Sequence, residues 1–194
     1  MNVNLKPIEI VYTGNISYGR WKTLAQVAEF LAVINSDYTK AILNIYSQNT
    51  INTEIDRAIN INKASYFRGS VSYNEVKKIL NKADIVLHVE SFENKYANAT
   101  RLSFSTKIID CMESGSCIMA IGPENLSSIS YLKNNNCALV ATDAQEINQL
   151  ILTVIESPNV ITQKAAALYE FAKKNHDIKT IQNMLDNDFK SLLN

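Results

Sequence analysis

Several residue types are scarce in this sequence of 194 residues, and each scarcity excludes a class of protein. There are two histidines and three cysteines, with no CxxC pair and no metal-ligand cluster, so a zinc enzyme is not expected. No apolar run is long enough to span a membrane, and the start MNVNLKPIEI lacks the charged and apolar regions of a signal peptide. Basic and acidic residues balance at 19 each, which argues against a broad nucleic-acid-binding surface.

The signature motifs of common nucleotide-binding folds and hydrolases are missing as well. The first predicted strand is not followed by G-x-G-x-x-G, and no acidic residue closes the second strand, which disfavours an NAD-binding fold. There is no G-x-x-x-x-G-K-[ST] of a P-loop NTPase, no acidic cluster of a phosphoacceptor receiver domain and no G-x-S-x-G of an α/β-hydrolase. The composition, 46% hydrophobic and 20% charged, is that of a globular protein with one domain or at most two small ones.

The chain alternates predicted strands and helices over most of its length. Strands are expected at 8–13, 41–47, 64–69, 83–90, 117–123 and 137–141. Helices are expected at 20–34, 50–60, 72–83, 104–115, 125–133 and 144–156, with a polar loop after residue 90. This order predicts an α/β fold with a doubly wound, mostly parallel sheet as domain 1–157. Two consecutive helices, at 158–175 and 177–193, are expected to pack on it as a C-terminal part, 158–194.

The five glycines mark one edge of this predicted sheet. Gly14, Gly69 and Gly122 each follow a predicted strand, whereas Gly19 opens a helix and Gly115 closes one. Glycine is used where φ is positive or where a ligand approaches the backbone closely. Ligands of open α/β sheets bind outside the carboxyl ends of the strands. The placement therefore favours a ligand site at this edge, although any tight strand–helix turn would also use glycine.

Two cations stand at the start of the first predicted helix. Arg20 and Lys22 follow the long connection TGNISYGRWK. The helix dipole already makes this end positive, so the protein gains little stability from cations there. Together with free backbone N–H groups they would suit an anion, and the alternative is that both are solvated surface residues.

The stretch FSTKIIDCMESG carries a second polar cluster. At about 100° per residue, Lys107 and Asp110 fall on one helix face, one turn apart, and Ser105 and Thr106 lie in the N-cap region, where they can hold an anion or cap the helix. The charged pair is either a surface ion pair or a site in which Lys107 neutralises phosphate and Asp110 accepts hydrogen bonds from ribose. We favour the site because a lysine at this helix end is unfavourable for the dipole.

The order of these segments resembles a known family. YTGN…GRWK, YFRGSVSYNEV, KADIVLHVESFE and FSTKIIDCMESGSCIMAIGP together resemble the C-terminal, donor-binding domain of a GT-B glycosyltransferase of the retaining group 1 type. The resemblance covers roughly residues 8 to 190. It implies that the predicted sheet is the Rossmann-like half of a GT-B fold, with C-terminal helices.

The resemblance also implies roles for individual residues. Diphosphate contact, and with it catalysis, would come from Arg20, Lys22 and Lys107, and no cofactor or metal is implied. The substrate-binding residues implied are Gly14 and Asn15 beside the phosphates, Phe67, Arg68, Gly69 and Val71 at the base, Asp110 at the ribose, and Ser105 and Thr106 facing the phosphates. The family's second acidic residue falls on Leu102, and Glu93 would replace it only if the loop between them folds back.

The resemblance further implies partners and a location. The partners would be a nucleotide-diphosphate sugar, either a UDP- or a GDP-sugar, and an N-terminal acceptor-binding domain that is missing from this chain. Transfer to an acceptor hydroxyl in bacterial polysaccharide biosynthesis would follow, with little turnover by this domain alone. Nucleic acid is not expected as a partner. The three cysteines lie among apolar residues, which favours reduced core thiols and a cytoplasmic location. The alternative location is at the inner membrane, to which the full-length protein would bind peripherally.

Two other functions stay open at this point. A nucleotide-sugar epimerase of the same two-domain fold would need catalytic acids and bases in its cleft, and the chain offers few. A non-catalytic interaction module would use the charged edge only as solvated surface.

Overall fold

Six parallel strands form the centre of the computed structural model, which describes residues 6–101, 103–105 and 107–192. The strands are β1 (Ile8–Thr13), β2 (Ala41–Tyr46), β3 (Ser65–Gly69), β4 (Ile85–Val89), β5 (Cys117–Ile121) and β6 (Leu139–Ala141). They are hydrogen-bonded in the order β3-β2-β1-β4-β5-β6. Every residue of β4 and β5 is buried, which explains why these segments are apolar apart from His88. The predicted doubly wound α/β sheet is confirmed.

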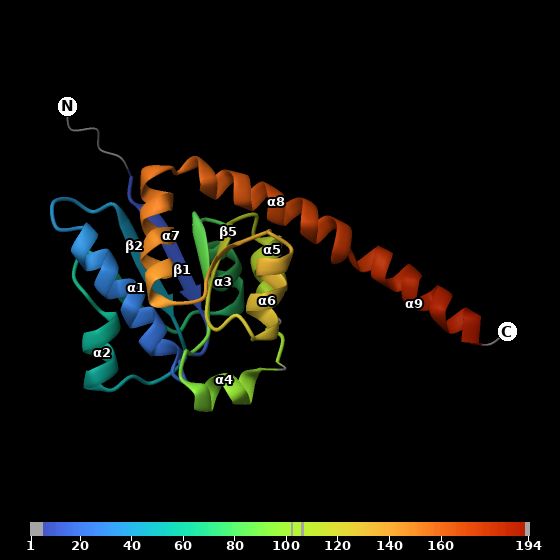
Figure 1. Ribbon diagram of the computed structural model, residues 1–194, viewed down its shortest axis with the longest axis horizontal. Helices are drawn as coiled ribbons and strands as arrows, with labels where there is room; N and C mark the ends of the chain where they lie inside the picture. The colour runs from blue at the N-terminus through green and yellow to red at the C-terminus, as the bar shows by residue number, and fades with distance from the viewer. Residues whose placement is uncertain (1–5, 102, 106, 193–194) are drawn as a thin grey trace.

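Helices cover both faces of the sheet (Figure 1). One face packs against α1 (Arg20–Ile34), α2 (Thr53–Ile59) and α7 (Ala144–Glu156). The other packs against α3 (Tyr73–Leu80), α5 (Lys107–Glu113), α6 (Ser127–Asn134) and α8 (Asn159–Asn175). Successive strand residues alternate between the two cores, so that Ile10 and Tyr12 join the first and Val11 the second.

A short helix, α4 (Asn94–Thr100), follows β4 where the sequence predicted only a polar loop. Ala97 is its one buried residue among seven. Because a single small side chain faces the core, the segment shows no apolar period from which a helix could be predicted.

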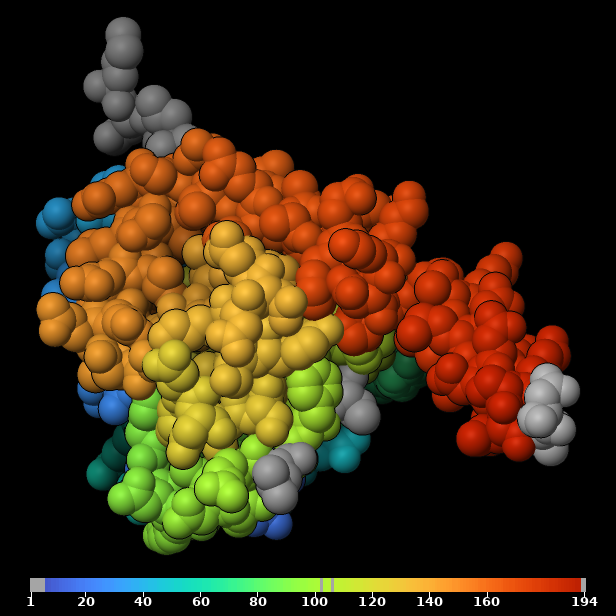
Figure 2. Space-filling view, turned by 45° about the vertical axis from the view of Figure 1, so that its right-hand side comes forward, coloured from blue at the N-terminus to red at the C-terminus, as the bar shows by residue number. Residues whose placement is uncertain are grey.

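The two C-terminal helices differ in their contact with the rest of the chain. Helix α8 runs across the end of α7 and buries Leu168 in the second core. Helix α9 (Ile178–Leu192) buries none of its residues and extends away from the sheet (Figures 1 and 2). Helix α8 thus packs on the sheet, whereas α9 lies apart from it, and the division into 1–157 and 158–194 stays a prediction. No helix within the described ranges has the length and apolar character needed to cross a membrane.

The three cysteines lie inside the fold as unpaired thiols. Cys111, Cys117 and Cys137 are all buried and free. Burial raises the pKa of Cys111 and of Cys117 to about 12, so both stay protonated at neutral pH.

A buried asparagine fixes the entry to β2. The Asn35 amide nitrogen donates to the carbonyl oxygens of Ala41 at 2.8 Å and Lys63 at 2.7 Å, while its oxygen accepts from the Lys40 N–H at 2.8 Å. One side chain thus joins the end of α1, the start of β2 and the turn before β3, where the backbone groups would otherwise lack partners.

We expect Asn35→Ala to destabilise the fold by roughly 2–4 kcal/mol, because it leaves several buried backbone groups unsatisfied. Urea unfolding followed by circular dichroism measures the change. The matched control is Asn60→Ala, which removes an exposed amide bonded to Asp56 and should cost about 0.5 kcal/mol or less. Equal effects of the two substitutions would contradict this role for Asn35.

Candidate functional site

A cleft of about 620 Å³ opens at the carboxyl edge of the sheet. Its walls come from the ends of β1 and β2, from the β3–α3 connection, and from helices α3 and α5. The strand order reverses between β1 and β4, since α1 leaves β1 on one face of the sheet and α5 follows β4 on the other. Open α/β sheets bind ligands at such a switch point, so the cleft lies where the topology predicts a site.

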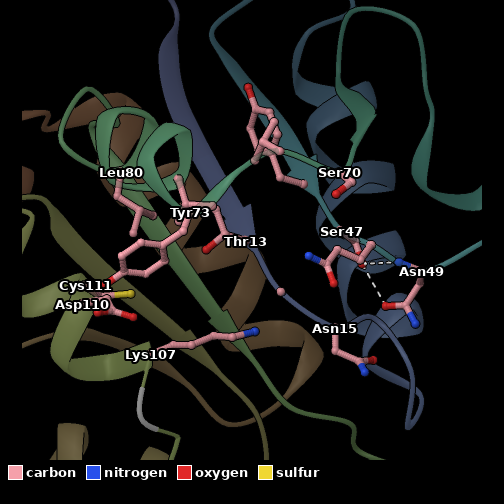
Figure 3. Close-up of a pocket in the computed structure, with 15 residues that line it drawn as sticks. Thr13, Asn15, Ser47, Asn49, Ser70, Tyr73, Leu80, Lys107, Asp110 and Cys111 are labelled. Carbon is pink, nitrogen blue, oxygen red and sulfur yellow. Dashed lines mark hydrogen bonds between the residues drawn. The ribbon is translucent and has the colours of Figure 1, made fainter.

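Lys107 extends across this cleft toward the β1–α1 loop (Figure 3). Its ammonium lies against Gly14, where any Cβ would collide with it, and Gly14 has a φ of 150°. The Lys107 ammonium can shift away, so it is the positive φ that disfavours a side chain at position 14. Within the described part of the chain, Lys107 makes no hydrogen bond or ion pair.

The pKa of Lys107 is lowered, first by desolvation of the ammonium and then by the positive charge of Arg20. An anion placed between Lys107 and the β1–α1 loop would relieve both effects. Among the described residues the Lys107 ammonium has no counter-ion, and the arrangement can accommodate an anion beside it.

Asp110 lines the same cleft one helical turn beyond Lys107. On the neighbouring helix α3, the ring of Tyr73 lies beside Asp110 and Cys111 (Figure 3), and Val76 and Leu80 add apolar surface. Tyr73 is 64% exposed and has the Lys77 ammonium over its ring, so only part of the ring is accessible to a ligand. From β1 to α3, the cleft therefore changes from cationic through acidic to apolar and aromatic.

The β1–α1 loop is held in place by polar side chains from β1 and from the segment after β2. The Asn49 side-chain oxygen accepts from the Ile16 N–H at 2.9 Å, and its nitrogen donates to the Ser17 hydroxyl at 3.1 Å. The Tyr12 hydroxyl donates to the Asn15 carbonyl at 2.7 Å. Sequence reasoning missed Asn49, although the polar run that follows a strand at the carboxyl edge was a usable signal.

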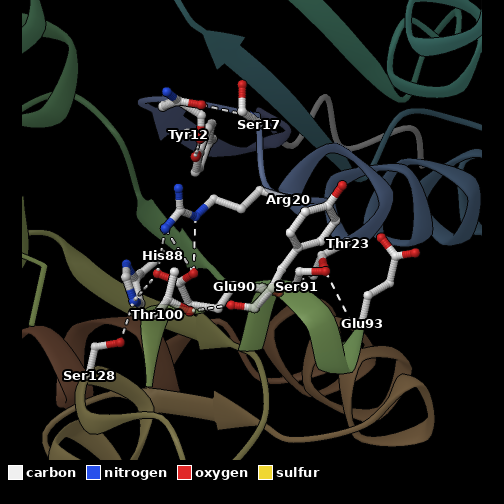
Figure 4. A network of polar contacts seen from close by, with 12 residues as sticks. Tyr12, Ser17, Arg20, Thr23, His88, Glu90, Ser91, Glu93, Thr100 and Ser128 are labelled. Atoms are coloured by element: carbon white, nitrogen blue, oxygen red, sulfur yellow. Dashed lines mark hydrogen bonds and ion pairs between the residues drawn. The ribbon is translucent and has the colours of Figure 1, made fainter. Parts of the chain in front are cut away.

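A buried polar network lies beside the cleft at the end of β4 (Figure 4). Arg20 donates from Nε and Nη2 to the two carboxylate oxygens of Glu90, each at 3.1 Å. The Thr23 hydroxyl donates to the Glu90 carbonyl at 2.9 Å. Burial raises the pKa of Glu90, and the charge and hydrogen bonds of Arg20 oppose this shift, so the carboxylate is stabilised by its partner.

His88 completes this network as a neutral imidazole. Its Nε2 lies 3.0 Å from the Ser128 hydroxyl and 3.9 Å from Glu90, too far for a hydrogen bond to the carboxylate. Burial, with the charges of Arg20 and Lys107, lowers the pKa of His88 to about 4.

Lys22 and Glu93 form a separate, outer ion pair. The Lys22 ammonium lies 3.0 Å from Glu93 Oε1, with half of the lysine side chain exposed. The other oxygen, Oε2, is buried without a hydrogen-bond partner in the described structure. Glu93 precedes α4 and does not line the cleft, so its predicted sugar contact stays a prediction without support from the geometry.

The structure brings some of the predicted site residues together and separates others. Those that line the cleft are Gly14, Asn15, Val71, Lys107 and Asp110. Those that lie outside its lining are Arg20, Lys22, Phe67, Arg68, Gly69, Glu93 and Ser105. Thr106 and Leu102 lie outside the described residues.

The β3 residues Phe67 and Arg68 do not line the cleft because their side chains contact the core and the neighbouring strand. The Phe67 ring packs against the first core. The Arg68 side chain donates from Nε to the Asn44 amide oxygen at 2.9 Å.

Comparisons with known proteins agree with this architecture. A family model described as glycosyl transferase-like matches residues 7–186. The C-terminal domain of LpcC, a glycosyl transferase group 1 family protein from Francisella tularensis, is similar with a TM-score of 0.62 and 14% identity, over 88% of this chain and 87% of that one. No curated protein matches the chain.

Two larger solved structures are similar as well. The E. coli trehalose-6-phosphate protein bound with UDP-2-fluoro glucose has a TM-score of 0.65 and 11% identity, over 94% of this chain and 44% of that one. WaaG, a glycosyltransferase involved in lipopolysaccharide biosynthesis, has a TM-score of 0.59 and 12% identity, over 87% of this chain and 44% of that one. The chain thus spans less than half of these two proteins, and at such identities the likeness is one of fold.

The neutral His88 makes the stability of the fold depend on pH. Because its native pKa of about 4 lies below the ordinary 6.5, the unfolded state binds a proton in this interval that the native state does not. We expect the neutral His88 to contribute up to about 3 kcal/mol to the free energy of unfolding above pH 6.5. This contribution should be lost as the pH falls toward 4. Urea unfolding of wild type and His88→Gln at both ends of the interval measures it.

His88→Gln keeps a hydrogen-bonding group near Ser128 but cannot titrate. The variant should therefore lose less stability than wild type between the two pH values. Equal losses in the two proteins would show that His88 does not carry this part of the pH dependence.

Proposed function

Because the chain belongs to the glycosyl transferase-like family and has the fold of a GT-B glycosyltransferase C-terminal domain, we propose that its cleft binds a nucleotide-diphosphate sugar as glycosyl donor. The observation that carries the proposal is the pairing of Lys107 and Asp110 on one wall of the cleft, with the ammonium against Gly14. A cation without a counter-ion suits a diphosphate. A carboxylate one turn away suits the two hydroxyls of a ribose.

The remaining walls fit the rest of such a ligand. With the diphosphate at Lys107 and the ribose at Asp110, the base would lie toward Tyr73, Val76 and Leu80, where a planar ring can pack on apolar and aromatic surface. The complex of the similar E. coli protein with UDP-2-fluoro glucose supports a UDP-sugar as the first ligand to test.

The chemistry we propose is electrostatic. When the bond between the sugar and the diphosphate breaks, negative charge grows on the leaving group, and the fixed positive charge of Lys107 stabilises it. Arg20 lies next to this position, whereas Lys22 is neutralised by Glu93 at the surface. We assign the leading role to Lys107 and a supporting role to Arg20. Lys22 and the other predicted contacts stay predictions.

The acceptor would bind outside this chain. The chain spans less than half of two of its structural relatives, which supports a partner domain that supplies the acceptor hydroxyl. We propose that the complete enzyme acts in bacterial polysaccharide biosynthesis, in the cytoplasm or at the inner membrane, and that these 194 residues alone bind nucleotide but turn over little.

We expect Lys107→Ala and Asp110→Ala to affect nucleotide binding in different ways. Loss of the ammonium should weaken UDP roughly tenfold or more and leave uridine nearly unchanged, because only UDP carries the diphosphate. Loss of the carboxylate should weaken UDP and uridine to a similar extent, because both carry the ribose. Isothermal titration with UDP, GDP, ADP and uridine measures these differences.

The controls are Lys40→Ala and Asp37→Ala, which change the same charges near the start of β2, at the opposite edge of the sheet. They should leave all affinities unchanged. If no nucleotide binds the wild-type chain at millimolar concentration, the proposal is wrong and an interaction module is favoured. Unchanged affinity in both cleft variants would remove this site.

A further inference from the structure

Glu90 holds one edge of the Arg20 guanidinium and leaves the other edge open. The carboxylate takes Nε and Nη2, with its closest contact, between Nη2 and Oε2, at 2.9 Å. Among the described residues, no hydrogen bond or ion pair uses Nη1. The pair is largely removed from water, with side-chain exposures of 19% for Arg20 and 8% for Glu90. Such a side-on, two-bond contact fixes the plane of the guanidinium.

Glu90 is itself fixed by the end of the sheet. Its backbone N–H donates to the Ile121 carbonyl at 2.8 Å, and its own carbonyl accepts from Thr23. Gly122 leaves room for it, since a Cβ at position 122 would lie 2.9 Å from the Glu90 Cβ. The orientation of Arg20 is therefore set by β4 and β5, and not by α1 alone.

The open edge of Arg20 points toward Tyr12, which lies between Arg20 and the β1–α1 loop. Figure 4 shows the guanidinium nitrogen that does not contact Glu90 pointing toward Tyr12. The Tyr12 hydroxyl and the Lys107 ammonium both border Gly14. The positive charge of Arg20 also contributes to the lowered pKa of Lys107, as expected for two cations that share one region.

We propose that Glu90 is a positioning residue for the donor site, which holds Arg20 so that its free Nη1 edge and Lys107 together face the diphosphate. The inference rests on the proposed function, because it assigns a second cation to the same ligand. An arginine that is already ordered loses less side-chain freedom on binding, which favours affinity.

A purely neutralising role for Glu90 predicts the opposite result. If the carboxylate only cancelled the charge of Arg20, its removal would leave a more positive site and strengthen diphosphate binding. If Glu90 positions Arg20, its removal frees the guanidinium to turn away and weakens diphosphate binding. The direction of the change in UDP affinity decides between the two roles.

The experiment measures UDP and uridine affinity by titration calorimetry for wild type, Glu90→Gln, Arg20→Met and the double variant Arg20→Met/Glu90→Gln. We expect Glu90→Gln to weaken UDP roughly three- to tenfold and to leave uridine unchanged. In the Arg20→Met background the same substitution should have no effect on UDP. The matched control is Glu124→Gln, which breaks the exposed pair with Lys133 outside the cleft and should change neither affinity.

Arg20→Lys is a second probe that leaves Glu90 in place. It keeps the charge but not the planar fork, and we expect a similar loss of UDP affinity. UDP binding that is unchanged or tighter in Glu90→Gln, an equal loss of UDP and uridine, or persistence of the effect without Arg20 would each overturn the inference. Failure of wild type to bind UDP or uridine would instead overturn the proposed function itself.

Discussion

The contact between β1 and β4 is the constraint on which the site depends. These strands pair in parallel through Ile10 with Ile85 and Val11 with Val86. Their carboxyl ends therefore open at the same edge of the sheet. Because α1 and α5 leave this edge on opposite faces, the two chain segments that follow the strands diverge and cannot fill the space between them. The cleft with Gly14 on one side and Lys107 on the other is a consequence of that divergence.

The charges around the cleft follow from the cost of burial. A charge that loses water must be paired, and the pair must be well oriented. Arg20 meets this condition by pairing with Glu90 inside the fold. Lys22 pairs with Glu93 at the surface, where both charges stay partly in water and the pair contributes little to stability. Lys107 faces the open cleft without a partner among the described residues. The fold thus leaves one cation accessible in the cleft and holds a second one in place near it.

Sequence periodicity predicted the parts of the structure that depend on near neighbours. The shared face of Lys107 and Asp110 depends only on the helical geometry of four consecutive residues. The burial of β4 and β5 is predicted by the apolar residues of these segments themselves. The pairing of Arg20 with Glu90 could not be predicted in this way, because 70 residues separate them and only the strand order brings them together. Helix α9 illustrates another limit of sequence periodicity. The spacing of its apolar residues predicts a helix but does not predict which surface packs against it.

The most direct test of this account is a crystal structure of the chain with UDP. The account predicts the diphosphate between the Lys107 ammonium and the β1–α1 loop, the ribose hydroxyls within hydrogen-bond distance of Asp110, and the base toward Tyr73. UDP bound at another surface, or in this cleft with its phosphates directed away from Lys107, would contradict it.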